Sequence, residues 1–369
     1  MQVTLFARVD PTLNPYLLLY KSALEKQGLI VQLEREFGLR WLIAKGKSCD
    51  VIHLHWIEAL YKPARRPIWS GLLGKLMQNR LMTPLRGAIR LANVSATLLL
   101  AKLQGKIIVY TIHNVRPHHK KEWPLVILNR LAHRIVFFVS ENVHAHSHYA
   151  RNIVKKVYRN AKVTVVPHGN YITHYVNQIS RRGARQQLGV PEDAFVYLFL
   201  GMIRPYKGVP ELIDAFRKLD LPAGQLLIVG RASSASYEKE ISDLSLGNPA
   251  IQLIPEFVPD ESIQIYMNAC DICVLPYRDT TTSGAAMLSL SFGRPIIAPA
   301  IASFPELITP ETGILYDPAR PDALKSALQH AAQRSWPESR ILAYVHQFDW
   351  DTLGPRLAGL YRARPDKLR

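Results

Sequence analysis

Two cations three positions apart occur in the turn GMIRPYKG, residues 201–208. This turn follows an apolar run at 195–200 that is typical of a buried strand. An arginine guanidinium and a lysine ammonium together can neutralise a leaving diphosphate without a metal. Arg204 and Lys207 therefore predict a diphosphate-binding site, and we expect neither a metal nor any other cofactor.

A second feature suited to phosphate is the polar loop DTTTSG at 279–284. The apolar run at 272–275 before it predicts a strand, and the compact apolar run at 285–292 after it predicts a helix. The start of a helix offers free backbone N–H groups and the positive end of the helix dipole. An ordinary helix cap is the alternative. The ligand-binding residues expected here are Thr281, Thr282, Ser283 and Gly284.

Titratable side chains follow two predicted strands in the first half of the chain. The run at 50–55 ends in His53 and His55, and the run at 107–112 leads directly into His113. Parallel sheets bind ligands at the carboxyl ends of their strands, so a general base is expected here. The alternative for His53 and His55 is simple packing beneath a loop. The candidate bases are His113 first, then His118, His119, Glu58 and Asp10.

The composition predicts a globular protein with an anionic partner. The chain has 369 residues, of which 48% are hydrophobic, and this length favours about two or three domains. Its formal net charge of +17 suits a nucleotide, a phospholipid surface or a nucleic acid. There are three cysteines; Cys270 and Cys273 have CxxC spacing but fall at a buried strand, so no zinc site is expected. We expect a cytoplasmic protein without a signal peptide or membrane span.

Strand and helix patterns alternate twice along the chain. This predicts an α/β fold with two Rossmann-like, doubly wound domains that face each other across a cleft. The expected domains are 1–172 and 173–345, followed by a C-terminal helix within 346–369. In the first domain we expect a helix at 125–133 and a strand at 134–139.

Basic and apolar residues alternate at helical spacing between 61 and 106, and no acidic residue occurs from 59 to 120. This pattern is typical of a segment in a membrane interface, where cations bind anionic headgroups and the apolar face inserts. A solvated helix with a core-facing apolar stripe is the alternative. The residues expected to contact the membrane or acceptor are Arg65, Arg66, Trp69, Lys75, Arg80 and Arg86.

Several motifs together resemble the GT-B glycosyltransferases, similar to family 4. They include VVPHGN at 165–170, FLGMIRPYKG at 199–208, LLIVG at 226–230, SFGRPIIAP at 291–299 and GILYDP at 313–318. The resemblance implies that the second domain binds a nucleotide sugar and the first binds the acceptor on the membrane side. It implies that Arg204 and Lys207 bind the donor diphosphate and that His113 approaches the sugar. It also implies that the C-terminal helix within 346–369 crosses back to the first domain. The other donor-binding residues that it implies are Gly201, Gly230, Glu256, Phe257 and Val258.

The chain departs from the usual family pattern at two glutamates. Their positions hold Thr280 and Leu288, so the sequence is more similar to a subset with a TSG loop, including mannosyltransferases of polysaccharide and glycolipid assembly. The expected reaction is transfer of a hexose, with inversion and from GDP-mannose, to a lipid-linked or oligosaccharide acceptor at the inner face of the cytoplasmic membrane.

Three other functions remain open from sequence. The first is a retaining transferase that uses UDP-glucose or another UDP-sugar. The second is a non-catalytic scaffold that binds nucleotide sugars, which the missing glutamates favour. The third is a nucleic-acid binder, which only the positive charge favours, so no nucleic-acid partner is expected. The absence of a GxGxxG after any predicted strand argues against a dehydrogenase.

Overall fold

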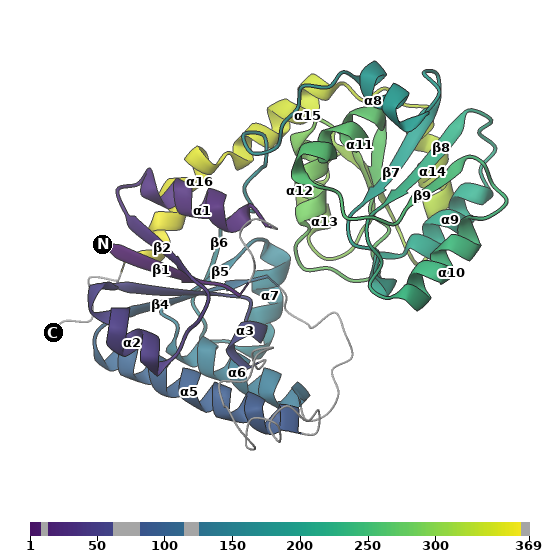
Figure 1. Ribbon diagram of the computed structural model, residues 1–369. Helices are drawn as coiled ribbons and strands as arrows, with labels where there is room; N and C mark the ends of the chain where they lie inside the picture. Colours follow the sequence, from purple (N-terminus) through teal and green to yellow (C-terminus); the bar gives the residue numbers. More distant parts are fainter. Residues whose placement is uncertain (9–13, 62–81, 114–124, 363–369) are drawn as a thin grey trace. The chain divides into compact units, whose positions relative to one another are not determined.

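The computed structural model describes residues 1–8, 14–61, 82–113 and 125–362. The chain forms two compact units (Figure 1). The first contains Met1–Pro167 together with Trp350–Arg369, and the second is His168–Asp349. The boundaries at 167 and 349 lie close to the expected positions, 172 and 345. The last segment of the chain therefore belongs to the same unit as the first strand.

The first domain contains a six-stranded parallel sheet with the order β2-β1-β3-β4-β5-β6. Its strands are β1 (Gln2–Phe6), β2 (Ile30–Glu34), β3 (Val51–His55), β4 (Ile107–Ile112), β5 (Asn142–Ala145) and β6 (Val163–Val165). Its helices are α1 (Tyr16–Glu25), α2 (Leu39–Lys45), α3 (Glu58–Tyr61), α5 (Thr83–Leu103), α6 (Leu125–Val139), α7 (His148–Val157) and α16 (Trp350–Ala358). Short 3₁₀ turns are η2 (Gly46–Ser48) and η7 (Gly359–Tyr361).

Helices cover both faces of this sheet, as the doubly wound prediction requires. In Figure 1, α1 and α16 lie on one face, and α2, α5 and α6 lie on the other. The first face buries Leu17 and Leu24 of α1 against Leu353 and Leu357 of α16. Burial of apolar area on both faces is the main stabilising contribution to such a sheet. The C-terminal segment is further fixed because the Asn142 side-chain amide donates to the Leu360 carbonyl over 2.6 Å.

The sequence prediction was wrong at residues 134–139. The run RIVFFV continues helix α6 to Val139, and the strand beside β4 is instead β5. Ala132, Val136 and Val139 are buried while Phe138 is exposed, which is a helical repeat and not the alternation of a strand. The true strand was missed because Asn142 and His144 make it polar, although both are buried.

The second domain repeats this architecture with the strand order β12-β11-β10-β7-β8-β9, again parallel. Its strands are β7 (Phe195–Leu200), β8 (Gly224–Val229), β9 (Ile251–Ile254), β10 (Ile272–Val274), β11 (Ile296–Pro299) and β12 (Gly313–Tyr316). Its helices are α8 (Arg181–Leu188), α9 (Val209–Arg217), α10 (Ala235–Ser245), α11 (Ile263–Ala269), α12 (Gly284–Ser291), α13 (Phe304–Leu307), α14 (Ala323–Ala332) and α15 (Glu338–Val345). Its 3₁₀ turns are η4 (Pro205–Lys207), η5 (Asp260–Ser262) and η6 (His346–Phe348). The α/β fold with two doubly wound domains is thus confirmed.

Candidate functional site

The expected donor-binding residues lie along one edge of the second sheet. Strands β10, β7, β8 and β9 are neighbours in this order, and all are parallel, so the segments after them meet at the carboxyl edge. The expected residues on these segments are Thr281, Thr282, Ser283 and Gly284 after β10, Gly201, Arg204 and Lys207 after β7, Gly230 after β8, and Glu256, Phe257 and Val258 after β9. The topology therefore gathers residues that span more than 80 positions of sequence.

The Lys207 ammonium lies in an apolar, aromatic setting at this edge. Its Nζ is 5.3 Å from the ring centre of Tyr277 and 5.8 Å from that of Phe199. Burial, and then the positive charge of Arg204, lower the pKa of Lys207 to about 8. An anion placed against this ammonium would offset both effects. The setting of Lys207 is therefore well suited to a negatively charged ligand.

Three glycines let the loops at this edge approach closely. Gly201 and Gly230 have φ of 132° and 138°, and a Cβ on Gly230 would lie 2.2 Å from the Gly201 carbonyl oxygen. A Cβ on Gly201 would lie 3.2 Å from Lys207 Nζ. Gly208 has φ of 69°, and a Cβ there would lie 2.0 Å from the Pro276 carbonyl oxygen. Only glycine fits these positions without a shift of the backbone.

The polar loop after β10 forms a capped helix start. Ser283 Oγ accepts a hydrogen bond from the Ala286 N–H over 3.1 Å and so caps α12. Thr280 and Thr281 are buried beside it. Thr282 Oγ1 is also shielded from solvent, and among the described residues it has no hydrogen-bond partner. Because a buried hydroxyl is normally paired, Thr282 is suited to bind a ligand oxygen.

Arg204 and the residues after β9 are partly or largely exposed to solvent. Arg204 is partly buried, and its Nε donates to the Met202 sulfur over 2.9 Å. Phe257 has 62% of its surface exposed and Glu256 is exposed as well, while Val258 is partly buried. An exposed phenylalanine is costly in water, so Phe257 is suited to stack on a flat ring such as a nucleotide base.

In the first domain, His113 is held by two rings at the carboxyl edge of the sheet. Its Nε2 lies 3.0 Å from His55 Nδ1. Its ring stacks on Trp56, with ring centres 4.0 Å apart and planes 10° from parallel. Trp56 has φ of 52°, which is unusual for a residue other than glycine and marks a local constraint at the end of β3. The Glu58 carboxylate, another candidate base, starts α3 nearby in sequence and is partly buried.

A chain of hydrogen bonds runs beneath His55 and His113. The Val166 carbonyl can only accept, so His144 Nε2–H donates to it over 2.9 Å. The Thr111 hydroxyl then donates to Nδ1 of a neutral His144 over 3.1 Å, and accepts from His53 Nε2–H over 2.7 Å. The Tyr361 hydroxyl donates to His53 Nδ1 over 2.8 Å. All of these groups are buried, and burial holds the pKa of His53 well below its ordinary value.

This chain was missed from sequence because His144 and Tyr361 lie in segments without a functional motif. Thr111 and His53 occur in predicted strands, but nothing in the sequence pairs them with Tyr361, which follows them by more than 240 positions. The polar content of β5 was the signal that could have found His144, since a buried strand with two polar side chains needs partners for them.

Some predicted site residues lie outside the described ranges. They are Asp10, His118, His119, Arg65, Arg66, Trp69, Lys75 and Arg80. Arg86 is described, and it is partly buried in the second turn of α5. In the described ranges, no helix is both long enough and apolar enough to cross a bilayer, and no cluster of three or more His, Cys, Asp or Glu side chains could hold a metal ion. Cys270 and Cys273 are buried thiols with sulfurs 4.0 Å apart.

Comparison with known proteins shows which family the second domain is similar to and which solved structures share the fold. Residues 180–341 match the family described as "Glycosyl transferases group 1". Over 348 residues, covering 90% of this chain and 87% of the relative, the sequence is 28% identical to a protein of Xanthomonas campestris pv. campestris named GDP-mannose:glycolipid 4-beta-D-mannosyltransferase.

Two solved structures share the fold across almost the whole chain. Sucrose-phosphate synthase from Thermosynechococcus elongatus superposes with a TM-score of 0.72 and 16% identity, covering 98% of both chains. The HepE protein of Anabaena in complex with UDP-glucose superposes with a TM-score of 0.69 and 20% identity, covering 97% of this chain and 98% of HepE. At these identities the likeness establishes the two-domain architecture.

Proposed function

We propose that the chain, a glycosyltransferase with the GT-B fold whose residues 180–341 match the group 1 glycosyl transferases, transfers mannose from GDP-mannose to a glycolipid acceptor. The mannosyltransferase from Xanthomonas, which aligns with nine-tenths of the chain, supports this choice of donor and acceptor. The main support for the donor-binding site is the Lys207 ammonium, which lies near two aromatic rings at the carboxyl edge of a parallel sheet.

In the proposed reaction an acceptor oxygen forms a bond to the anomeric carbon of mannose. The bond from that carbon to the diphosphate oxygen breaks, and GDP leaves with the electron pair. Lys207 and Arg204 offset the charge that develops on the diphosphate. The start of α12 and the Thr282 hydroxyl bind further oxygens of the donor. Phe257 and its neighbours hold the guanine base.

We propose that the reaction inverts the configuration of mannose. The mannose of GDP-mannose is α-linked, so a β-linked product requires a single displacement with one general base at the acceptor hydroxyl. His113 is the proposed base, because its ring is fixed by Trp56 and His55 at an edge where a ligand can bind. Retention with a UDP-sugar is the competing mechanism, and it would need no such base.

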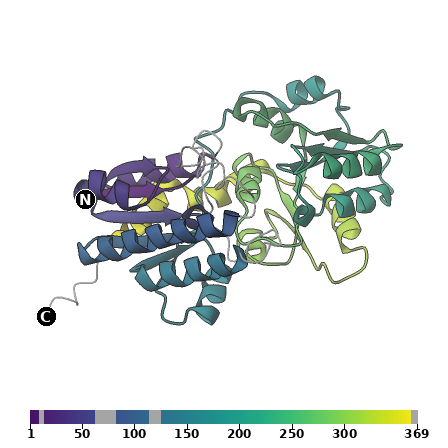
Figure 2. The same cartoon turned by 60° about the horizontal axis from the view of Figure 1, so that its bottom comes forward.

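We also propose that the first domain docks on an anionic membrane through α5 and α6. Neither helix contains an aspartate or glutamate. They lie side by side in Figures 1 and 2, and both expose apolar side chains. The exposed apolar side chains are Leu85, Ile89, Leu99, Leu100 and Leu103 on α5, and Ile127, Leu131 and Phe138 on α6. Lys102, Arg130 and Arg134 are exposed on the same two helices. The apolar side chains could therefore insert into the bilayer while the basic ones attract anionic headgroups.

A panel of nucleotide sugars tests the donor. The purified enzyme is incubated with a glycolipid acceptor and GDP-mannose, UDP-glucose or ADP-glucose, and release of the nucleoside diphosphate is followed. The proposal predicts acceptor-dependent release of GDP at least about tenfold faster than release from the other donors. Faster release of UDP would replace GDP-mannose by the competing donor. No acceptor-dependent release from any donor would favour a role in binding alone.

A further inference from the structure

Tyr277 has a buried hydroxyl at the edge of the second sheet where the expected donor-binding residues lie. It follows β10, in the segment that leads to α12, and only 5% of its surface is exposed. Its hydroxyl is shielded from solvent, and no group among the described residues forms a hydrogen bond with it. A buried hydroxyl is normally paired, and an unpaired one is destabilising. A ligand that supplied the missing partner would therefore be bound more tightly.

The Tyr277 side chain is close to both parts of the proposed diphosphate site. Its ring centre is 5.3 Å from Lys207 Nζ, within the range of a cation–π contact. Burial raises the pKa of Tyr277, and the nearby hydroxyl of Ser283, the N-cap of α12, opposes this with a smaller effect. The ring thus faces the ammonium, and the hydroxyl is near the start of the helix. A diphosphate bound to both would bring a neighbouring part of the donor to this hydroxyl.

Two further hydroxyls reach the start of α12. Thr282 Oγ1 is shielded from solvent and, in the part of the chain that the structure describes, has no hydrogen-bond partner. The Tyr171 hydroxyl lies where a Cβ on Gly284 would be 3.4 Å from it. The Tyr171 N–H donates to Ser291 Oγ over 2.9 Å, so backbone and side chain of this residue both lie against α12. Together with Tyr277, these residues place several neutral hydroxyls at one helix start.

Neutral hydroxyls are better suited to a sugar than to a phosphate. A hydroxyl both donates and accepts, as do the hydroxyls of a sugar, whereas the oxygens of an ionised diphosphate only accept. The charge of the diphosphate is already offset by Lys207 and Arg204 in the proposed site, and the N–H groups at the start of α12 can bind its oxygens. The hydroxyls therefore indicate an uncharged, polar part of the donor, which is either the hexose or the ribose.

The strand order favours the hexose. The base is proposed to stack on Phe257, which follows β9, and the diphosphate to bind Lys207, which follows β7. In the order β10-β7-β8-β9, Tyr277 follows β10, on the side of β7 away from β9. A donor that lies along this edge would run from its base near β9, through its diphosphate near β7, to its hexose near β10.

We propose that the Tyr277 hydroxyl binds a hydroxyl of the donor hexose and thereby contributes to the choice of sugar. The inference rests on the proposed function for the identity of that hexose and of its nucleotide. Two other partners for this hydroxyl, an ordered water and the GDP part of the donor, are separated by the experiments below.

The first experiment compares GDP-mannose with GDP by calorimetry, in the absence of acceptor. Tyr277→Phe keeps the ring beside Lys207 and removes only the hydroxyl. We expect it to weaken binding of GDP-mannose at least about fivefold and to leave the affinity for GDP within about twofold. Equal weakening of both ligands would assign the hydroxyl to the GDP part, and no weakening of either would assign it to water. Both of these results would overturn the proposal.

Tyr197→Phe is the matched control, because Tyr197 is a buried tyrosine of the same domain whose hydroxyl donates to the Leu328 carbonyl over 2.7 Å. It should lower the temperature of thermal unfolding and leave the affinity for GDP-mannose unchanged. Tyr277→Phe should not lower the unfolding temperature, since it removes a polar group that the fold leaves unpaired. A fall as large as that of Tyr197→Phe would mean that the Tyr277 hydroxyl is bonded within the fold, and would overturn the proposal.

A set of GDP-deoxymannoses, each lacking one hydroxyl of the hexose, identifies the group that Tyr277 contacts. One of them should bind equally to the wild type and to Tyr277→Phe, because the hydroxyl that pairs with Tyr277 is already missing. The same loss from Tyr277→Phe with every deoxy sugar would contradict a direct contact.

Failure of the proposed function would be seen in the wild type, as a preference for a UDP-sugar. The comparison is then made with that UDP-sugar and UDP, so the inference about Tyr277 is tested in either case.

Discussion

His55 Nδ1 and His113 Nε2 lie 3.0 Å apart, so each imidazole determines which nitrogen of the other carries a proton. A neutral imidazole has one free lone pair, so His113 can accept the proton of an acceptor hydroxyl at Nδ1 only if its Nε2–H donates to His55 Nδ1. The proton of His55 is then on Nε2, which is buried and has no hydrogen-bond partner among the described residues. In the proposed mechanism His55 therefore orients His113 and sets its tautomer.

Replacement of His113 should affect chemistry far more than donor binding. We expect His113→Ala to lower kcat by about 10² to 10⁴, because the acceptor hydroxyl loses its base, and to leave GDP affinity within about tenfold. Steady-state kinetics and calorimetry with GDP measure the two quantities. A kcat equal to that of the wild type would remove His113 from the mechanism.

His55→Leu should have a smaller effect than His113→Ala, since it removes only the partner of His113. We expect kcat to fall about tenfold while KM for GDP-mannose stays within about twofold. A loss as large as that of His113→Ala would mean that His55 itself contacts the reacting atoms.

Binding of nucleoside diphosphate should weaken above pH 8. The free protein holds the pKa of Lys207 near 8, and the bound anion favours its charged form, so binding above this pH takes up a proton. The affinity for GDP should therefore fall by up to about tenfold per pH unit above pH 8. Calorimetry in buffers with different ionisation enthalpies measures the proton uptake at pH 9. Lys207→Ala should bind GDP weakly at every pH, without this uptake. A wild-type affinity that stays constant to pH 9.5 would contradict the role of Lys207.

The first domain should lose stability in mild acid. Burial lowers the pKa of His53 and of His55 well below 6.5, so below this pH the unfolded chain binds protons that the folded protein does not. The contribution of the two histidines to the free energy of unfolding is fully present above the pKa that histidine has in the unfolded chain. It is lost as the pH falls below that value, by up to about 1.4 kcal/mol per pH unit for each histidine. Urea unfolding at pH 7.0 and 5.5 measures the change.

Two variants assign this pH dependence to the buried histidine. His53→Gln should lose less free energy of unfolding than the wild type between pH 7.0 and 5.5. His330→Gln, which replaces an exposed histidine of α14, should lose as much as the wild type. Identical slopes in all three proteins would show that His53 does not remain neutral in the folded protein.

The membrane proposal is tested at Phe138, which is 79% exposed on α6. Phe138→Asp places a negative charge where insertion into an anionic interface is proposed, so we expect binding to anionic vesicles to fall at least tenfold. Leu246→Asp is the matched control, since Leu246 is 66% exposed at the end of α10, in the second domain. Vesicle sedimentation at low and physiological salt measures both. Equal binding of the two variants would place the docking face elsewhere.

Strands that are apolar runs could be predicted from the sequence. The positions of the loops that follow these strands could then be predicted as well. Lys207 and the loop before Gly284 could be expected at the carboxyl edge because β7 and β10 are apolar and end at recognisable turns. Strand β5 could not be predicted, since its buried Asn142 and His144 are polar and depend on Leu360 and Val166 for partners. Such partners are known only once distant segments are packed together.

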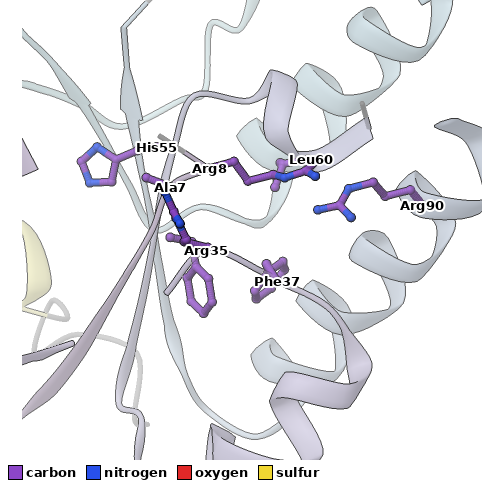
Figure 3. Close-up of a pocket in the computed structure, with 8 residues that line it drawn as sticks. Ala7, Arg8, Arg35, Phe37, His55, Leu60 and Arg90 are labelled. Carbon is purple, nitrogen blue, oxygen red and sulfur yellow. The ribbon is translucent and has the colours of Figure 1, made fainter. Parts of the chain in front are cut away.

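The pocket drawn in Figure 3 illustrates the same limit, since Arg8, Arg35 and Arg90 are among the residues that line it. Arg8 and Arg35 each follow a strand, but Arg90 lies within helix α5, among many other basic residues of the first half. Nothing in their spacing predicts that the three line one pocket. They do so because β1 and β2 are neighbours in the sheet and α5 packs against the same domain.

The most direct test of the central claim is the anomeric configuration of the product. The purified enzyme, GDP-mannose and a glycolipid acceptor are combined, and the new linkage is read by proton NMR while GDP is quantified. We predict one β-mannosidic linkage for each GDP released. An α-mannosidic linkage would contradict inversion and the role of His113 as base, and transfer that occurs only from a UDP-sugar would contradict the proposed donor.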